Sequence, residues 1–175
     1  TLAPELDHSA PGELRAAKLP HLRHVIRIGD EAGAGMRSFD DVVRLGARAG
    51  HGAVEALAPK LRCDDPINIQ FTSGTTGSPK GATLSHHNIV NNAYFVGRAV
   101  GLGEQDRLCI PVPLYHCFGM VMGNLACVAH GAAMVYPSEA FDPLATLETI
   151  EAERCTALYG VPTMFVAQLQ HADFA

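Results

Sequence analysis

One short stretch of the sequence combines the residue types that bind phosphate groups. Residues 71–81 read FTSGTTGSPKG and contain three glycines, five hydroxyl side chains and one lysine. Backbone N–H groups that curl around an anion, with short hydroxyl donors and an ammonium group beside them, suit a polyphosphate. The alternative is a flexible Gly/Ser/Thr linker. It is disfavoured because linkers do not usually begin directly after a buried strand and end in Pro-Lys-Gly.

This stretch is not a P-loop, although the offset from Gly74 to Lys80 matches the pattern G-x-x-x-x-G-K-[ST]. Pro79 precedes the lysine where a P-loop has glycine. Gly81 follows the lysine where a P-loop has the hydroxyl that binds magnesium. Because proline fixes φ and removes a backbone donor, a different kind of phosphate-binding loop is indicated.

The segments around the loop predict an α/β fold, with a mostly parallel sheet and helices on its faces. From residue 67 onward, expected strands alternate with expected helices. The strands are 67–71, 108–112, 132–136 and 157–159, and the helices are 85–100, 118–130, 142–154 and one that opens at Pro162. Ligand sites in such folds lie beyond the carboxyl ends of strands. Since strand 67–71 runs directly into the loop, the loop should lie at such a site.

Two subdomains are expected. Residues 1–62 would be the end of a first α/β subdomain plus a connecting segment, and residues 63–175 an α/β subdomain that carries the loop and is truncated at its C-terminus. The chain starts at Thr1 and stops at Ala175, directly after a helical pattern without a capping signal. We therefore expect a fragment, with covalent continuation of the same chain upstream and downstream.

The composition narrows the classes of partner. Hydrophobic residues make up 47% of the chain and charged residues 18%, and the net charge is −5. This balance gives no reason to expect a nucleic acid as partner. The five cysteines are odd in number and never in C-x-x-C order, which favours reduced thiols. With no signal peptide or transmembrane segment found, we expect a cytoplasmic protein, and peripheral membrane association stays open.

A metal site is not expected at His86-His87, the paired histidines at the start of a predicted helix. Adjacent side chains on a helix diverge by about 100°, so the two imidazoles cannot easily share one ion. No third and fourth ligands follow at the spacing of structural zinc sites. We therefore expect no metal bound by protein side chains.

Three segments carry a resemblance to a known family. The run IQFTSGTTGSPKGATLSHHN, 69–88, resembles the highly specific phosphate-loop signature of the adenylate-forming superfamily, which includes acyl-CoA synthetases, luciferases and adenylation domains of peptide synthetases. PVPLYHCFGM (111–120) and LYGVPTMF (158–165) resemble later blocks of that family. PGELRAAKLPHLRHVIRIG (11–29) is similar to the upstream region of medium-chain fatty acyl-CoA synthetases. Together these segments cover nearly the whole chain.

The resemblance implies an acid–thiol ligase whose substrates are a fatty acid, ATP with Mg²⁺, and coenzyme A. The carboxylate would attack the α-phosphate to give an acyl-adenylate, and the coenzyme A thiol would then displace AMP. The family role of nucleotide binding falls on Thr72, Ser73, Gly74, Thr75, Thr76, Gly77, Ser78, Pro79 and Lys80. Lys80 and Thr76 would be the catalytic groups of this loop, and His116, Phe118 and Gly119 would line the acyl pocket.

The family's adenine-binding Tyr-Gly-x-Thr-Glu block is absent from this sequence, so the fragment alone should be inactive. Two alternatives stay open. One is a nucleotide- or phosphate-binding module without ligase chemistry. The other is an adenylate-forming ligase that uses another acid or a carrier-protein acceptor.

Overall fold

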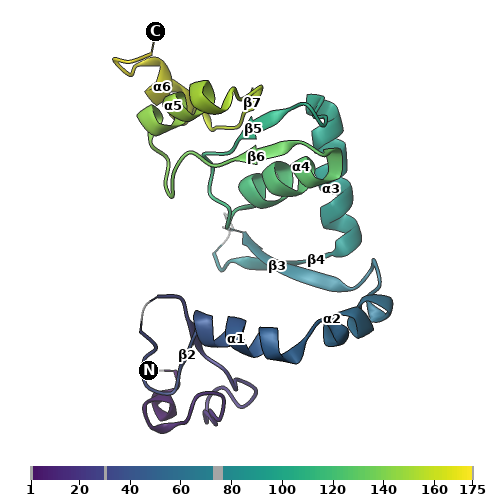
Figure 1. Cartoon of the computed structure of the whole chain (residues 1–175), viewed down its shortest axis with the longest axis vertical. Coiled ribbons are helices and arrows are strands. Elements are labelled where there is room, and N and C mark those ends of the chain that lie inside the picture. The colour runs from purple at the N-terminus through teal and green to yellow at the C-terminus, as the bar shows by residue number, and fades with distance from the viewer. Residues whose placement is uncertain (1, 30, 73–76, 175) are drawn as a thin grey trace. The chain divides into compact units, whose positions relative to one another are not determined.

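The computed structural model describes residues 2–29, 31–72 and 77–174 (Figure 1). The chain divides into two compact units, Thr1–Leu61 and Arg62–Ala175. The assignment of residues 1–62 to the end of a first α/β subdomain stays a prediction.

The first unit contains short elements and one regular helix. A two-residue strand β1 (Ile26–Arg27) pairs in parallel with β2 (Arg37–Ser38). Helix α1 (Phe39–Ala49) follows, and Ser38 and Asp41 form the capping box that the sequence pattern indicates: the Asp41 N–H donates to Ser38 Oγ at 3.1 Å. The remaining helical segments are η1 (Pro4–His8), α2 (Gly52–Leu57) and η2 (Ala58–Lys60).

The second unit is built around a three-stranded parallel sheet, which confirms the predicted α/β class. Strand β5 (Arg107–Cys109) lies in the centre, between β6 (Ala133–Val135) and β7 (Ala157–Leu158). Five helical segments accompany the strands (Figure 1): α3 (His86–Val100), the π-helical η3 (Phe118–Leu125), α4 (Ala126–His130), α5 (Pro143–Glu153) and α6 (Pro162–Leu169).

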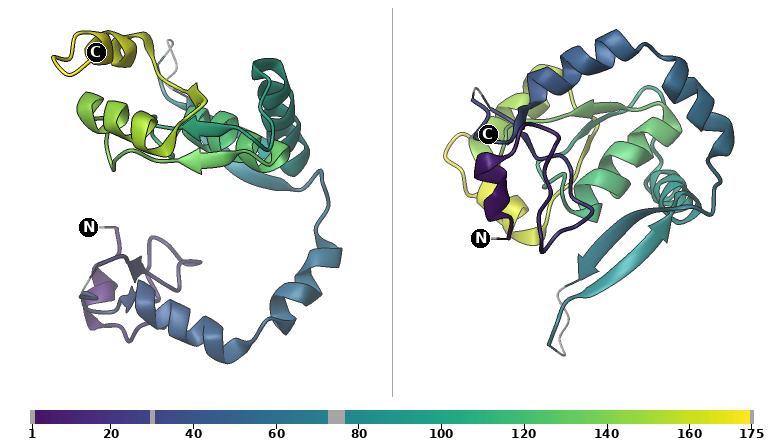
Figure 2. Two further views of the ribbon diagram at one scale, coloured as in Figure 1. Left: turned by 45° about the horizontal axis from the view of Figure 1, so that its top comes forward. Right: turned by 90° about the horizontal axis from the view of Figure 1, so that it is seen from below.

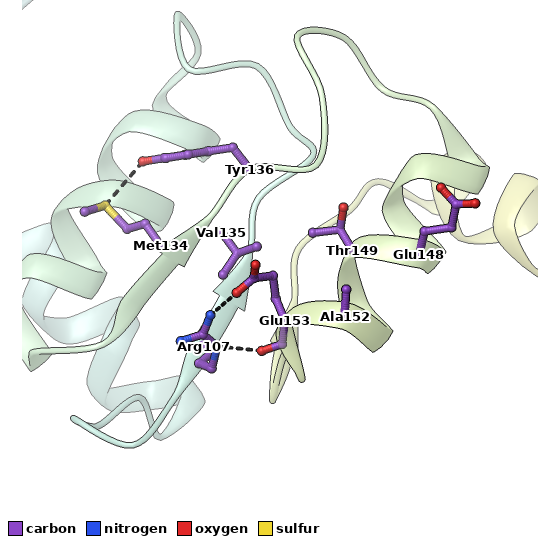
Figure 3. A pocket seen from close by; sticks show the side chains of 8 residues that line it. All are labelled: Arg107, Met134, Val135, Tyr136, Glu148, Thr149, Ala152 and Glu153. Carbon is purple, nitrogen blue, oxygen red and sulfur yellow. Dashed lines mark hydrogen bonds and ion pairs between the residues drawn. The ribbon is translucent and has the colours of Figure 1, made fainter.

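The topology places helices on both faces of this sheet. The connection from β5 through α4 to β6 moves one way along the sheet, and the connection from β6 through α5 to β7 crosses back over β5. Two right-handed crossovers in opposite directions put their helices on opposite faces. Figure 3 shows β6 with a helical layer on either side.

The core of the second unit lies between the sheet and its helices. Its buried members come from β5, from α4 and from the turns that flank them: Leu102, Leu108, Ile110, Val112, Ala126, Cys127 and Ala132. Burial raises the pKa of the neighbouring Cys109 thiol to about 12. Cys109 is therefore protonated at neutral pH and behaves as a packed apolar side chain, not as a nucleophile.

The strand at residues 67–71 corrects one expectation from the sequence. It extends over Pro66–Thr72 (β3) and pairs antiparallel with β4 (Lys80–Ser85), so it belongs to a hairpin and not to the parallel sheet. The expected order passes directly from loop to helix and misses β4. In KGATLS, apolar and polar residues alternate only over residues 82–85, the shortest run that can indicate a strand, and the pairing with β3 is what identifies it. Figure 2 shows the hairpin extending away from α3.

Within the described ranges, every helix is too short or too polar to cross a lipid bilayer.

Candidate active site

The β3–β4 hairpin carries the predicted phosphate loop between its strands. Thr72, the last residue of β3, lies opposite Lys80, the first residue of β4, and the Thr72 hydroxyl donates to the Lys80 carbonyl oxygen at 3.5 Å. Antiparallel pairing therefore brings the two ends of the loop together. The loop leaves the end of a strand, as expected, although that strand is not part of the parallel sheet.

The structure describes only part of this predicted site. Ser73, Gly74, Thr75 and Thr76 lie outside the described residues. Gly77 has φ +119°, a backbone conformation that side chains with a Cβ rarely adopt. Gly77, Ser78, Pro79 and Lys80 follow one another along the exposed second half of the loop. A glycine here lets the chain turn back into β4 and brings Lys80 to the mouth of the loop.

Lys80 can present its ammonium group to a ligand. It is exposed, and within the parts of the chain that the structure describes no carboxylate lies within ion-pair distance of it. Its backbone is held in the β3–β4 ladder while its side chain extends from the strand. An exposed ammonium beside a glycine-rich turn suits the binding of an anion.

His116 lies in the turn that follows the central strand. Its backbone N–H donates to the Pro113 carbonyl at 3.2 Å, and its ring Nδ1 accepts the Phe118 N–H at 3.1 Å. Since Nδ1 accepts this bond, the neutral ring carries its proton on Nε2. The exposed imidazole thus has an N–H to donate to an anionic substrate.

Phe118 and Gly119, the other two predicted pocket residues, are placed by packing. The Phe118 ring lies against Tyr159, with ring centroids 5.1 Å apart, and packs on the core. Gly119 is buried, and a Cβ at this position would lie 2.5 Å from the Pro113 carbonyl oxygen. These two residues hold the turn that presents His116. Their role in an acyl pocket stays a prediction.

A cleft of about 420 Å³ lies beyond the carboxyl ends of β5 and β6. Its lining comes from the segment after β5, the segment after β6 and the start of α6: Ile110, Pro111, Val112, Pro113, Leu114, Tyr115, Tyr136, Ser138, Glu139, Ala140, Phe141 and Met164. The Tyr136 hydroxyl donates to Asn124 Oδ1 at 3.0 Å, and burial raises the Tyr136 pKa, so this phenol stays neutral. The cleft is mostly apolar, with a few polar groups along one side.

A second, smaller cleft of about 260 Å³ lies between the hairpin and η3. Leu114 and Tyr115 line both clefts, and Cys117 and Met120 belong to this one. Its wall is also mainly apolar. The Leu114–Tyr115 pair therefore borders both apolar spaces, and His116 follows it in the chain, but the residues that line the two clefts do not include His116, Phe118 or Gly119.

Most of the residues of these clefts were not predicted as site residues. Tyr136 and Phe141 lie in one segment, far in sequence from Met164 and from the segment after β5, and no motif links these three segments. The rule that sites lie beyond the carboxyl ends of parallel strands could have found the segments after β5 and β6. Which side chains of those segments line the cleft depends on turns that no periodic pattern encodes.

A further cavity of about 460 Å³, between β6 and α5, is explained by structural contacts (Figure 3). Arg107 Nε donates to the Glu153 carbonyl at 2.6 Å, and the Arg107 guanidinium also pairs with the Glu153 carboxylate. Figure 3 shows both side chains turned toward each other from β5 and α5. The charge of Arg107 is thus used to fasten α5 to the sheet.

Comparisons with known proteins identify the class. The sequence profile of the AMP-binding enzyme family matches residues 7–175. Mitochondrial medium-chain acyl-CoA ligases named ACSF2 are 47% identical over 176 residues in Danio rerio and 46% identical over 179 residues in Homo sapiens. Each match covers 99% of this chain and 29% of the relative. The chain thus spans about three tenths of the length of these relatives.

Solved structures agree with this class. ATP-bound MatB from Rhodopseudomonas palustris has a TM-score of 0.58 and 34% identity, over 64% of this chain and 22% of that one. The o-succinylbenzoate CoA synthetase MenE from Bacillus subtilis, in complex with its acyl-adenylate intermediate, has a TM-score of 0.58 and 29% identity, over 65% of this chain and 29% of that one. The chain belongs to the AMP-binding enzyme family, the adenylate-forming enzymes that the sequence motifs resemble.

Proposed function

We propose that the full-length protein activates a fatty acid with ATP and transfers the acyl group to coenzyme A. The observation that carries this proposal is the 46–47% identity to medium-chain acyl-CoA ligases across nearly the whole chain. The β3–β4 hairpin, which brings the two ends of the predicted phosphate loop together, supports it. The apolar clefts next to His116 suit a hydrocarbon chain.

In the first step, a carboxylate oxygen bonds to the α-phosphorus while the bond from that phosphorus to pyrophosphate breaks. Negative charge grows on the leaving pyrophosphate. The Lys80 ammonium, the Thr72 hydroxyl and the backbone N–H groups of the loop would bind and stabilise that charge. The hydroxyl oxygens of the loop are donors that Mg²⁺ accepts, and Mg²⁺ bound with ATP would supply further neutralisation there.

In the second step, the coenzyme A sulfur bonds to the acyl carbon, AMP leaves, and the thiol proton passes to solvent. This chain's contribution would be to hold the acyl group of the adenylate in the clefts that Leu114 and Tyr115 line. In the first step, the Nε2–H of His116 would donate to the carboxylate of the acid.

Pyrophosphate release from the full-length protein tests the proposal. Given ATP, Mg²⁺ and fatty acids of increasing length, release should depend on the acid, and coenzyme A should be consumed. Binding of ATP without release of pyrophosphate for any acid would favour a non-catalytic nucleotide-binding module. Transfer to a carrier protein in place of coenzyme A would show that the protein is an adenylate-forming ligase with a carrier-protein acceptor.

Another acid is the second candidate, because o-succinylbenzoate CoA synthetase, whose name gives an aromatic dicarboxylic acid, shares this fold at 29% identity. An acid panel should therefore include dicarboxylic and aromatic acids. If these acids turn over faster than any fatty acid, the proposed substrate changes from a fatty acid to one of these classes. The proposed adenylation reaction stays the same.

Lys80→Ala is the direct test of the loop. Loss of one preorganised charge-stabilising group should slow pyrophosphate release by about 100-fold or more. The matched control is Lys60→Ala, which removes an exposed lysine outside the predicted site and should leave the rate unchanged. Equal rates for Lys80→Ala and the parent protein would show that the phosphate loop is wrongly assigned.

A further inference from the structure

Three different metal-ligating side chains gather at the base of the β3–β4 hairpin. Cys63 and Asp64 precede β3, and His87 lies in the first turn of α3. Among the described residues, their ligand atoms (a sulfur, a carboxylate oxygen and an imidazole nitrogen) all lie within 4.8 Å of one another. The hairpin register pairs Pro66 with Ser85 at this end and Thr72 with Lys80 at the loop end, so the group lies opposite the loop.

Backbone hydrogen bonds hold the two segments together. The His87 N–H donates to the Cys63 carbonyl at 2.8 Å, and the His86 N–H donates to the Asp65 carbonyl at 3.3 Å. The Arg62 N–H donates to Asp65 Oδ2 at 2.8 Å and closes the turn before β3. The three side chains are therefore placed side by side by contacts of the main chain, without any ion.

The donor set has the chemistry of a zinc site. Zinc takes thiolate, imidazole and carboxylate ligands at about 2.0–2.3 Å, and sites with three protein ligands keep a fourth position for water. Two ligands of one such ion lie at most about 4.6 Å apart, and about 3.5 Å apart at a tetrahedral angle. Closing the group by about 1 Å requires only side-chain rotation, since all three residues are exposed.

We propose that Cys63, Asp64 and His87 bind one Zn²⁺ ion. Binding displaces the thiol proton of Cys63 to solvent, because the thiolate is the ligand. A thiolate ligand selects against Mg²⁺ and Ca²⁺, which prefer oxygen. The site is therefore chemically distinct from any Mg²⁺ that accompanies ATP.

This proposal departs from the expectation of no protein-bound metal. His86 and His87 do not share one ion in this proposal, as expected, since His86 is not part of the group. The other ligands come from the segment before β3, which the hairpin brings beside α3. The histidine spacing alone could not show this, because β4 was not among the expected elements.

A bound ion would join the segment before β3 directly to α3. In the chain, this segment and α3 are otherwise connected through β3 and β4. The base of the hairpin would then be cross-linked at its side chains as well as by the backbone ladder. The zinc site would thus fix the base of the hairpin relative to α3. The other end of this hairpin carries the predicted phosphate loop.

The test is metal binding by the full-length protein, reduced and stripped with a chelator. Cobalt(II) should bind with a thiolate-to-metal charge-transfer band, and stoichiometric zinc should abolish that band. Cys63→Ser should lose the band, and His87→Gln and Asp64→Asn should weaken zinc affinity by at least about tenfold. Cys63→Ala serves as a second variant if the serine disturbs the turn, and circular dichroism checks that each variant is folded.

Two matched controls separate this site from others. His86→Gln changes the neighbouring histidine on the same helix, and Cys117→Ser removes another exposed thiol. Both should keep the cobalt band and the zinc affinity of the parent protein. The proposal is overturned if the parent shows no thiolate band, if the band survives in folded Cys63→Ser, or if either control weakens binding as much as His87→Gln.

Discussion

Gly119 shows how tightly the turn after β5 is packed. It is buried in η3, and a Cβ there would lie 2.5 Å from the Pro113 carbonyl oxygen and 2.9 Å from its carbon. Atoms of the main chain cannot move aside as the end of a flexible side chain can. Because Gly119 has no side chain, η3 can begin directly against the backbone of the segment that follows β5 and carries His116.

Gly119→Ala should destabilise the protein by about 1–3 kcal/mol, because overpacking against the backbone outweighs the better helix propensity of alanine. Thermal unfolding of the full-length protein measures the effect as a lower transition temperature. Gly103→Ala is the control, since the nearest atom to a Cβ at that position is 3.8 Å away. A transition unchanged by Gly119→Ala but lowered by Gly103→Ala would reverse this reading of the packing.

His116 is the residue whose chemistry could be anticipated least from its type alone. A histidine after a strand can be a ligand, a base or a packed side chain. The hydrogen bond from the Phe118 N–H to Nδ1 settles which nitrogen carries the proton in the neutral ring. It also fixes the ring orientation and leaves the Nε2–H as the donor of the neutral ring.

Helix α3 depends on its cap, because it starts directly where β4 ends. The Asn88 N–H donates to Ser85 Oγ at 3.3 Å, and the Ser85 N–H donates to Asn88 Oδ1 at 3.1 Å. This reciprocal pair satisfies two backbone donors at the start of the helix. Gly101, at φ +78°, closes the other end in the left-handed conformation.

Ser85→Ala should cost about 1 kcal/mol at the start of α3. Hydrogen–deuterium exchange measures this locally, and the amides of the first turn should exchange about five times faster. Ser85→Asp keeps an acceptor for the Asn88 N–H and should leave exchange near that of the parent protein. If the alanine and aspartate variants exchange alike, the cap does not limit opening of the helix.

The elements that the sequence predicts correctly are those with strong local signals. The capping residues Ser38, Ser85 and Asp142 each begin a helix, and Gly131, at φ +73°, ends α4. The parallel strands were found because each short apolar run lies between helical patterns. Their described lengths are shorter than expected, since edge residues of a short strand lack a partner.

The hairpin and the buried faces were harder to predict. Strand β4 alternates apolar and polar residues only over residues 82–85, so the sequence signal is weak and its pairing with β3 is what reveals it. The apolar spacing of Ile89, Ala93, Val96 and Val100 predicts the buried face of α3, and this prediction is partly wrong. Ile89 and Ala93 are buried, but Gly97 completes the face and Val100 is 55% exposed. The His130 ring lies where a Gly97 side chain would be, and sequence periodicity cannot show such a long-range contact.

At the scale of the whole chain, each unit contains a carboxylate that accepts several hydrogen bonds. Asp41 accepts them from neighbouring residues, and Asp106 accepts one from a residue far away in the sequence. In the first unit Asp41 caps α1, and hydrogen bonds from Ser38 hold its pKa below the usual range, with Arg44 contributing. In the second unit Asp106 accepts the Thr156 hydroxyl at 2.7 Å and the Gly103 N–H at 2.8 Å. Asp106 thus ties the start of β5 to the segment that leads into β7.

This carboxylate predicts how the second unit responds to acid. The Thr156 hydroxyl, and then the Gly103 N–H, hold the pKa of Asp106 below its ordinary value of 3.8. A group whose pKa is lower in the folded state contributes stability that is present above the unfolded pKa and lost as pH falls through the folded pKa. The contribution of Asp106 should therefore be complete at neutral pH, begin to fall as the pH approaches its ordinary pKa of 3.8, and be lost as the pH falls through the lower pKa of the folded state.

Asp106→Asn should remove this contribution, because the amide nitrogen cannot accept the second hydrogen bond. In a pH series of thermal unfolding, the variant should melt below the parent protein at neutral pH, and the two transition temperatures should converge in acid. Asp41 and the other carboxylates titrate in both proteins and cancel in the difference. Curves that stay parallel down to acid pH would mean that the Asp106–Thr156 bond does not contribute to the stability of the sheet.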